Sequence, residues 1–522
     1  MNNKEIKITL TGRIDSGNAA GVEQEILAQL GSERDISLIL DAERLEYISS
    51  AGLRVLLRVR KTCPAMKIVN VNPEVYEILD MTGFTEMMPV EKAYRVVSVE
   101  GCEEIGRGAN GTIYRIDRDN VVKVYNNADA LEDIRHEREV AKLALILGIP
   151  TAISYDVVRV GESYGSVFEL LNARSFSKIL AQEPEKLDWC VEEYIKLLRI
   201  IHGTLVPEGK LPDMRETALG WARFMRGFLP EAAGEKLLAL VEAVPRDDHM
   251  LHGDYHTKNV MLQNDEVLLI DMDTLAVGHP IFELASIYNA FVGYSEADHE
   301  QILAFQGFDF QTGLTFWHKA LAAYLGTSCP AKLREVEDKA RIIGYARMIR
   351  RSIRRRGLET EKGRAEIALW KEELLELLER TDKLTFDLNE LEIDAETENL
   401  AQVQTFVEER LEKTDCSPRT MMQISVAVEE VFVNIALYAY APGKGRARVR
   451  AEIGGDPAAA VITFMDRGMP YDPLARTDPD ISLPAEEREP GGLGILMTKK
   501  LMDEAAYEYR DGQNVLTLKK KL

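Results

Sequence analysis

The first 95 residues alternate short strand-like runs with helical patterns. The segments IKITLTG, ISLILD and MKIVNV are rich in β-branched residues, and GVEQEILAQLG and AGLRVLLRVRK between them place apolar residues at helical spacing. Such alternation within a short stretch predicts a small α/β domain over residues 1–95.

Residues 100–380 begin with strands and continue mostly as helices. The glycine-punctuated pair IGRGANGTIYRI and NVVKVY precedes a charged helix, DALEDIRHEREVAKLALILG. From about 176 to 385 the pattern is helical except for one β-rich stretch, MLHGDYHTKNVMLQNDEVLLIDMD. The charged segment ETEKGRAEIALWKEELLELLERTDK reads as the closing helix of a second domain, over 100–380.

The remaining residues, 385–522, predict a third domain that mixes helices and strands. One long helix, SPRTMMQISVAVEEVFVNIALYAYA, is followed by the strands RARVRAEI and AAVITFMD. A Pro/Asp-rich loop and a glycine-rich turn then lead into LGILMTKKLMD. The fold class that we predict is therefore a multidomain chain of α/β and α+β type.

Composition agrees with a globular chain of several domains. A chain of 522 residues exceeds one hydrophobic core, so we expect three domains, with two or four as alternatives. The excess of 86 Asp and Glu over 64 Lys and Arg gives a net charge of −22, which argues against direct nucleic-acid binding by global charge. The five cysteines include no CxxC pair, and no stretch approaches ~18 apolar residues. We expect a cytoplasmic protein without a structural zinc or a membrane segment.

A serine pair stands where the second strand of the first domain leads into a helix. The segment reads Ser49-Ser50-Ala51-Gly52-Leu53, and serines at such a point can simply cap the free N–H groups of the helix. A phosphate there is also stabilised, because helix N-termini favour anions by ~0.3–1 kcal/mol.

The whole of residues 1–95 resembles the STAS domain of anti-sigma factor antagonists. The carrying segments are the serine pair with its Gly-Leu and the closing EVYEILDMTGF. In that family a serine in a D-S-[ST/A]-G-L segment is phosphorylated, and the resemblance implies Ser50 as this acceptor. Ser49 stands where the family more often has Asp.

The second domain opens with a GxGxxG pattern between two strands, formed by Gly106, Gly108 and Gly111. A lysine, Lys123, lies on the next strand, which is the order of a kinase and not of a dinucleotide site, where a helix follows the glycines. Glycines let backbone N–H groups approach phosphates, and the lysine can hold their oxygens. Glu137 on the following helix could pair with Lys123, and Glu139 is an alternative.

The β-rich stretch of the second domain carries a candidate catalytic set. His252-Gly253-Asp254 is followed by Asn259 and then by Asp271 at a strand end. Phosphoryl transfer needs a carboxylate near the acceptor hydroxyl, with an amide and a second carboxylate to hold Mg²⁺. Asp254, Asn259 and Asp271 provide these groups.

These motifs, in this order, resemble the aminoglycoside phosphotransferases and related protein-kinase-like enzymes over about 100–345. The resemblance implies a bilobal fold with Asp254 as catalytic base and with Asn259 and Asp271 as metal ligands. It places the adenine hinge at Glu169–Leu171. Asp273 and Glu283 are expected to be structural.

A run of arginines follows in RIIGYARMIRRSIRRRG. On a helix its members spread around most of the circumference, which favours a solvated face paired with acidic neighbours. A dock for an acidic partner or a phosphate is the alternative. The run comprises Arg341, Arg347, Arg350, Arg351, Arg354, Arg355 and Arg356.

The third domain carries a second candidate nucleotide site. Glu430 and Asn434 are four residues apart on the long helix and share one face, so they can position a hydroxyl and bind Mg²⁺. Glu429 lies about 100° around the helix and is expected at the surface. A strand-end Asp466 can accept a hydrogen bond from an adenine amino group. In the turn before the last helix, Gly491, Gly492 and Gly494 would let backbone amides approach phosphates at the helix start.

These parts resemble the GHKL ATPase fold, an α/β sandwich, over about 385–522, and the anti-sigma factor serine kinases in particular. The carrying segments are DRGMPYDP, EPGGLGILMTKKLMD and YRDGQNVLTLKKKL. The resemblance implies Glu430 as the residue that activates the acceptor serine, Asn434 as the Mg²⁺ ligand and Asp466 as the adenine contact. It also places Gly468, Gly492 and Gly494 in the nucleotide pocket and its lid. Tyr438 stands where the family has a His just after the Asn position.

Together the three resemblances imply a regulatory fusion of partner-switching type, an ATP- and Mg²⁺-dependent phosphotransferase in transcription regulation. The third domain would phosphorylate Ser50 in cis or in trans, and the added charge would repel an acidic partner face. The implied partners are STAS antagonists and anti-sigma or sigma factors, with a serine phosphatase, a small-molecule acceptor and a second copy of the chain as further candidates.

Two alternatives stay open. In one, the middle domain is the working kinase for a small-molecule or protein hydroxyl and the flanking domains regulate it. In the other, the chain is a nucleotide-gated scaffold that scarcely turns over. Complete catalytic sets in both domains argue against the scaffold.

Overall fold

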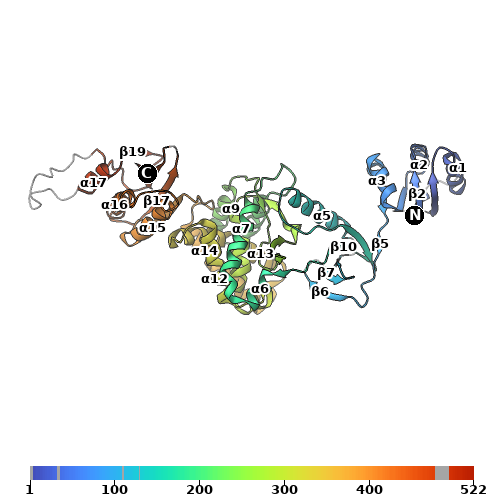
Figure 1. The fold of residues 1–522 in the computed structure, drawn as a ribbon, viewed down its shortest axis with the longest axis horizontal. Coiled ribbons are helices and arrows are strands. Elements are labelled where there is room, and N and C mark those ends of the chain that lie inside the picture. The colour runs from blue at the N-terminus through green and yellow to red at the C-terminus, as the bar shows by residue number, and fades with distance from the viewer. Residues whose placement is uncertain (1–3, 32–35, 109–110, 128–129, 456, 476–492) are drawn as a thin grey trace, which may run out of the picture. The chain divides into compact units, whose positions relative to one another are not determined.

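The computed structural model describes the chain except for residues 1–3, 32–35, 109–110, 128–129, 456 and 476–492 (Figure 1). The chain forms two compact units. One comprises Met1–Glu139 and Ala152–Leu171, and the other comprises Val140–Thr151 and Asn172–Leu522. The domain boundaries expected at 95, 100, 380 and 385 stay predictions.

The first unit begins with a four-stranded parallel sheet in the order β1-β2-β3-β4, drawn in blue in Figure 1. Parallel neighbours need a crossover between them, and helices provide it. Buried apolar residues of strands and helices, such as Leu38, Leu40, Val55 and Val59, share one core. The elements are β1 (Lys4–Ile14), α1 (Ala19–Leu30), β2 (Ile36–Ile48), α2 (Ser50–Thr62), β3 (Met66–Val71), α3 (Pro73–Met81), α4 (Phe84–Met87) and β4 (Val90–Lys92).

The same unit contains a six-stranded sheet in the order β5-β9-β10-β8-β7-β6. Neighbouring strands within this sheet are antiparallel, except for the parallel pair β5 and β9. The helix α5 (Leu131–Ile146) begins in this unit and ends in the other. The strands are β5 (Arg95–Val96), β6 (Glu103–Arg107), β7 (Gly111–Arg115), β8 (Asn120–Tyr125), β9 (Asp156–Val160) and β10 (Ser163–Glu169).

The second unit starts with a helical region that holds the largest core of the described chain. Its helices are α6 (Phe176–Gln182), α7 (Leu187–His202), α8 (Met214–Arg226), α9 (Glu231–Glu242), α10 (Ile281–Phe291), α11 (Glu300–Gln306), α12 (Phe310–Leu325), α13 (Pro330–Arg354) and α14 (Glu361–Arg380). Short antiparallel strands interrupt them at β11 (Arg174–Ser175), β12 (Met250–Leu251), β13 (Val260–Gln263), β14 (Glu266–Leu269) and β15 (Ala276–Val277). This matches the helical pattern with one β-rich interruption.

The C-terminal region of the second unit is a five-stranded antiparallel sheet with helices packed on it. The strand order is β16-β17-β18-β20-β19. Along β18 every second residue is buried, as a sheet with one covered face requires. The elements are β16 (Glu390–Asp394), α15 (Leu400–Leu411), α16 (Pro418–Asn434), η6 (Ile435–Ala439), β17 (Arg446–Gly454), β18 (Ala459–Asp466), α17 (Leu493–Leu501), β19 (Glu504–Arg510) and β20 (Gln513–Lys521). The prediction of a mixed α/β multidomain chain is confirmed.

Among the described residues, one helical stretch, Pro418–Ala439, is long and apolar enough to cross a membrane by length and composition. It packs into the C-terminal core instead, through residues such as Ile424, Val428 and Phe432. Its last turn, η6, is a π-helix, a form that is frequent at functional sites.

Within the second unit, the start of α13 is joined to the C-terminal sheet. Cys329 and Ala331 belong to the core of that sheet. The carboxylate of Glu409, on α15, accepts a hydrogen bond from the backbone N–H of Ser328 at 2.7 Å. The start of α13 and the residues just before it therefore pack as part of the C-terminal region.

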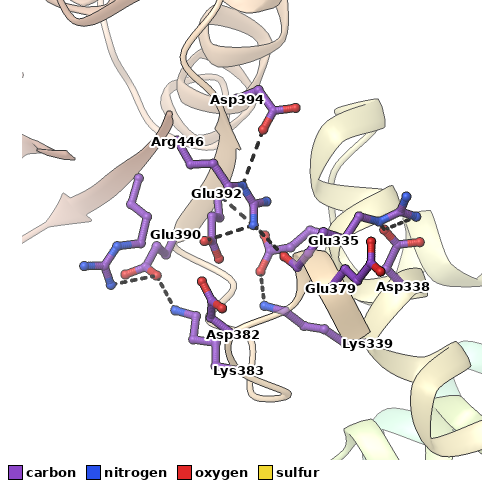
Figure 2. Close-up of polar contacts among 12 residues, drawn as sticks. Glu335, Asp338, Lys339, Glu379, Asp382, Lys383, Glu390, Glu392, Asp394 and Arg446 are labelled. Atoms are coloured by element: carbon purple, nitrogen blue, oxygen red, sulfur yellow. Dashed lines mark hydrogen bonds and ion pairs between the residues drawn. The ribbon is translucent and has the colours of Figure 1, made fainter. Parts of the chain in front are cut away.

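A buried cluster of charges completes this joint. Glu335 forms ion pairs with Lys332 and Lys339, and the three side chains are only 5%, 1% and 4% exposed. Figure 2 shows the contact between Glu335 and Lys339. Lys339 also donates to the backbone oxygen of Thr385 at 3.0 Å, and the N–H of Glu392, on β16, donates to Glu335 at 3.4 Å. We call Lys332, Glu335 and Lys339 the joint cluster.

Candidate functional site

The expected phosphorylation site lies at the start of α2. Ser49 is the N-cap residue, and its Oγ accepts the N–H of Ala51 at 3.2 Å. Ser50, the first residue of the helix, is exposed. The two readings of the serine pair thus fall on different residues: Ser49 caps the helix, and the hydroxyl of Ser50 stands where an anion is stabilised by the helix terminus.

Gly52 determines how closely this helix start approaches the sheet. A Cβ on Gly52 would lie 2.6 Å from Ile48 Cγ1 and 2.9 Å from Ile14 Cγ2, which are closer than real Cβ contacts. Any other residue would push the start of α2 away from β1 and β2. The glycine of the motif therefore serves packing, and the serines before it serve the helix end.

In the first unit, Lys123 on β8 pairs with Glu137 on α5. Lys123 Nζ lies 2.9 and 3.0 Å from the two carboxylate oxygens, and the side chains are 14% and 12% exposed. Tyr125 OH also donates to Glu137, at 2.6 Å. Glu139 is exposed, so the geometry selects Glu137 from the two alternatives. The contact from Tyr125 was not expected from the sequence, although Tyr125 follows Lys123 by two and so shares its face of the strand.

The glycine pattern spans the turn between β6 and β7. The N–H of Gly108 donates to the oxygen of Gly111 at 2.9 Å. A Cβ on Gly111 would meet Val124 O at 2.3 Å, so this position tolerates no side chain. Gly106 lies on β6, and the residues between Gly108 and Gly111 are not described. The expected hinge, Glu169–Leu171, begins at the last residue of β10, where Glu169 is exposed and Leu171 half-buried.

In the second unit, the segment from β12 to β13 carries Asp254 and Asn259. Asn259 is 6% exposed, and its Nδ2 donates to the backbone oxygen of Asp254 at 3.0 Å. Because the amide nitrogen is used in this bond, the amide oxygen is the atom suited to a cation. The carboxylate of Asp254 is 45% exposed and lies 3.5 Å from Nε2 of His256.

Asp254 is held in its charged form. Burial would raise the pKa of this carboxyl, but the hydrogen bond from His256 and the positive charges of His256, Arg347 and His252 outweigh burial and lower the pKa to about 2. The group is therefore a carboxylate over the whole physiological range, as an acceptor of a proton must be.

The backbone before Asp254 is fixed by groups that the motif does not contain. The carboxylate of Glu283, on α10, accepts from the N–H groups of His252 and Gly253, the latter at 3.1 Å. The oxygen of Gly253 accepts from Ser286 Oγ at 3.0 Å and from Arg347 Nη1 at 3.2 Å. Glu283 thus has the structural role expected of it, and the support from Ser286 and Arg347 was missed because it comes from distant helices.

The other expected metal ligand, Asp271, is exposed and follows β14 with φ of +65°. A left-handed backbone is rare for residues other than Gly, Asn and Asp, and here it occurs at the turn that follows β14. No group of three or more His, Cys, Asp or Glu in the described chain could hold a metal by itself. An amide and a carboxylate with nucleotide phosphates nonetheless fit Mg²⁺, which is commonly bound by one or two protein groups and substrate oxygens.

In the C-terminal region, Glu430 and Asn434 share one face of α16, and both are half-buried, while Glu429 is exposed. Asn434 Nδ2 donates to the backbone oxygen of Glu430 at 2.7 Å. Gly494, in α17, faces them closely, because a Cβ there would lie 1.8 Å from Glu430 Oε2. The glycine therefore leaves space directly at the carboxylate.

The end of β18 carries Asp466, which is 7% exposed. Its Oδ1 accepts from the N–H of Gly468 at 2.9 Å and from Nδ2 of Asn514 at 2.8 Å. A Cβ on Gly468 would meet Ala439 O at 2.3 Å, so the turn needs glycine. Asn514 was not expected as a site residue; its place in the C-terminal segment YRDGQNVLTLKKKL was the available signal. Gly492 lies outside the described residues.

Comparison with known families assigns three regions. A STAS domain model matches residues 2–97, a phosphotransferase enzyme family model matches 101–318 and a histidine kinase-like ATPase domain model matches 393–520. These are the three families that the motifs predicted, and that prediction is confirmed.

Curated relatives match parts of the chain. A putative anti-sigma factor antagonist of Bordetella bronchiseptica, BtrV, is 38% identical over 85 residues, which are 16% of this chain and 72% of that protein. The serine/threonine-protein kinase BtrW of the same organism is 28% identical over 102 residues, 20% of this chain and 71% of that protein. An anti-sigma F factor antagonist of Paenibacillus polymyxa is 25% identical over 87 residues, 16% of this chain and 74% of that protein.

Among solved structures, an ADP-bound aminoglycoside phosphotransferase is 14% identical, with a TM-score of 0.39, and covers 59% of this chain and 99% of its own. A choline/ethanolamine kinase family protein from Mesorhizobium loti is 13% identical, with a TM-score of 0.36, and covers 53% of this chain and 88% of its own.

Proposed function

We propose, since the chain belongs to the anti-sigma factor antagonist family through its STAS domain, that it is a partner-switching regulator whose C-terminal domain phosphorylates Ser50. The observation that supports this is the presence in one chain of an exposed serine, Ser50, at a helix start and of the Glu430–Asn434 face opposite Gly494. The modified serine is that of the same chain or of another antagonist domain.

Besides Mg·ATP, the proposed chemistry uses only side chains of these domains. Glu430 would take the proton of the Ser50 hydroxyl, the serine oxygen would bond to the γ-phosphorus of ATP, and the bond from that phosphorus to the ADP oxygen would break. Asn434 offers an oxygen ligand for Mg²⁺, and Asp466 offers a carboxylate for the adenine amino group. ATP supplies the phosphoryl group.

Phosphorylation would add roughly −1.5 to −2 charges at Ser50. The site is a solvated helix end, so the phosphate itself is tolerated there, but a partner surface that is acidic would be repelled. Anti-sigma and sigma factors, a serine phosphatase that resets the switch and a second copy of the chain are the proposed partners. We place the protein in the cytoplasm, where ATP is available.

Intact-mass spectrometry of the full chain with Mg·ATP tests the proposal. The wild type should gain ~80 Da, and Ser50→Ala should gain none. Ser49→Ala is the matched control, because it removes the cap and keeps the acceptor hydroxyl. Glu430→Gln should slow the gain by roughly 10²–10⁴-fold, while Glu429→Gln should leave it unchanged. Full modification in Glu430→Gln would reject the C-terminal domain as the donor.

A second proposed activity belongs to the middle domain, as a kinase for a small-molecule or protein hydroxyl. It is favoured by the formed Lys123–Glu137 pair and by the supported Asp254 carboxylate. In a chain with Glu430→Gln, any remaining transfer should disappear in Asp254→Ala while nucleotide binding persists, because the base acts on the acceptor. Unchanged transfer in the double variant would reject this activity.

A further inference from the structure

The second half of α13 carries an arginine face that the sequence did not predict. With about 100° per residue, four of the seven arginines fall within an arc of about 100°, because their spacing is i, i+3, i+4 and i+7. They are Arg347, Arg350, Arg351 and Arg354. We call these four residues the arginine face.

The other three arginines of the run lie elsewhere. Arg341 is on a different side of the helix and pairs with Glu373 at 2.6 Å. The helix ends at Arg354, so Arg355 and Arg356 follow it. Arg341 thus fits the expected pairing with an acidic neighbour, whereas the four arginines in the second half of the helix share one face.

Aromatic rings hold three of these guanidinium groups. The ring centroids lie 5.3–5.9 Å from the guanidinium carbons: Arg347 over Trp221, Arg350 over Phe224, and Arg351 over Tyr294. A ring face attracts a cation without neutralising it. The face is thus ordered and still positively charged.

Within the part of the chain that the structure describes, no carboxylate lies within 4.0 Å of the arginine face. The chain as a whole is acidic, with 86 Asp and Glu and a net charge of −22, so these four neighbouring arginines form a local positive patch. Exposed arginines in the C-terminal sheet, by contrast, have such partners: Arg450 pairs with Asp387 at 2.7 Å. Burial and the charge of Arg354 lower the pKa of Arg350, as expected where like charges gather.

The arginine face begins at the catalytic segment. Arg347 donates to the oxygen of Gly253, the residue before Asp254, and to Ser286 Oγ at 2.9 Å. Arg351 and Arg354 lie four and seven residues further along the helix, or roughly 6 and 10 Å at 1.5 Å per residue. Arg347 thus links the arginine face to the segment that carries the half-exposed carboxylate of Asp254.

We propose that the arginine face binds the anionic group of a small-molecule acceptor, a phosphomonoester or a compound of equivalent charge. Guanidinium groups bind such oxyanions by paired N–H donors. A cationic ligand would be repelled by the positive charge of the four arginines. A polycationic amino sugar is therefore the wrong acceptor for this domain. The transfer to such an acceptor rests on the second proposed activity, but the binding does not.

Calorimetric titration of the full chain, with both nucleotide sites saturated by Mg·AMP-PNP, tests the binding without turnover. The probes are glycerol 2-phosphate and, as the neutral match, glycerol. The phosphate should bind saturably and glycerol should not. Arg351→Gln/Arg354→Gln should weaken phosphate binding about tenfold, the loss expected for two partly exposed ion pairs. Arg355→Gln/Arg356→Gln removes the same charge from beyond the helix and should leave the affinity unchanged.

Three results would overturn the proposal: no saturable binding by the wild type, equal affinity in wild type and Arg351→Gln/Arg354→Gln, or equal loss in both double variants. Binding of an acidic phosphopeptide without binding of glycerol 2-phosphate would reject a small-molecule ligand in favour of a polypeptide. Asp254→Ala should bind the probe normally, so a failure of the second proposed activity would show only in transfer and not in this titration.

Discussion

Two lysine–glutamate sites among the described residues use the same charged groups but differ in burial and in surroundings. Lys123 and Glu137 form a pair in the first unit, with side chains 14% and 12% exposed. The joint cluster of the second unit uses one carboxylate for two ammonium groups, all of them 5% exposed or less. The first contact joins β8 to α5, whereas the second also bonds to the backbone oxygen of Thr385 and the backbone N–H of Glu392, in β16.

This difference in burial determines whether the lysine of a lysine–glutamate contact can exchange its carboxylate partner for a ligand. A pair with residual exposure can exchange its partners for a phosphate oxygen, as a nucleotide-binding lysine must. A fully enclosed cluster cannot, because separating its charges leaves each of them desolvated. The joint cluster therefore connects α13 to the C-terminal sheet and is not a candidate site.

The largest expected effect is on stability at the joint cluster. Glu335→Ala leaves Lys332 and Lys339 buried without their carboxylate, which should cost about 3–5 kcal/mol of unfolding free energy. Chemical denaturation of the full chain measures this. Glu376→Gln is the control, because Glu376 is 64% exposed in its pair with Arg380 and should change the free energy by less than about 1 kcal/mol. Equal effects would remove the distinction between enclosed and exposed pairs.

The next effect is on nucleotide binding at Lys123. Lys123→Met removes a charged donor to phosphate and should weaken Mg·AMP-PNP binding by about ten- to a hundredfold, equivalent to ~1.5–3 kcal/mol. The measurement uses a chain with Asp466→Ala, so that the C-terminal site does not contribute. Stability should fall less than in Glu335→Ala, because Glu137 keeps its hydrogen bond from Tyr125. A stability loss as large as that of Glu335→Ala, with unchanged affinity, would make the Lys123 pair structural.

The pH dependence of the joint cluster gives a smaller effect. Burial would raise the pKa of Glu335, but the charges and hydrogen bonds of Lys332 and Lys339 outweigh it and hold the pKa below the ordinary value of 4.5. A carboxyl with a lowered folded-state pKa stabilises the fold above its unfolded pKa, and this contribution is lost as pH falls through the folded pKa.

The stability difference between wild type and Glu335→Gln should therefore be full at pH 6 and narrow below about pH 4, by about 1.4 kcal/mol per pH unit at most. Urea denaturation of the wild type and of Glu335→Gln, at pH 6 and below pH 4, measures this difference. A difference that stays constant with pH would mean that Glu335 is not charged in the folded chain.

The smallest effect is at the tyrosine beside the first pair. Tyr125→Phe removes the hydroxyl that donates to Glu137 and contacts Ser166 Oγ at 3.2 Å, and should cost about 0.5–1.5 kcal/mol of stability. Nucleotide affinity should change less than in Lys123→Met. Tyr114→Phe is the matched control, from the neighbouring strand β7. A larger affinity loss in Tyr125→Phe than in Lys123→Met would mean that Glu137, and not Lys123, is what the nucleotide site depends on.

The sequence by itself determined the three families, the strand-and-helix patterns and the order of the nucleotide motifs. It could do so because glycine turns, strand-end carboxylates and apolar periodicity are local features that need no knowledge of distant contacts. It placed Lys123 and the HGD segment for the same reason, and it separated Glu430 from Glu429 by helix geometry alone. The roles of these residues stay proposals.

Only the tertiary structure decided which charges meet. Glu137 and Glu139 are equivalent in sequence until α5 is packed on β8, which buries one and exposes the other. The joint cluster reads along the chain as an ordinary charged helix face, and it is buried in the structure, where Glu335 and Lys339 bond to the backbone of Glu392 and Thr385. The arginine face likewise emerges from the end of α13 and from the rings of α8, since helix boundaries and long-range neighbours are not local properties.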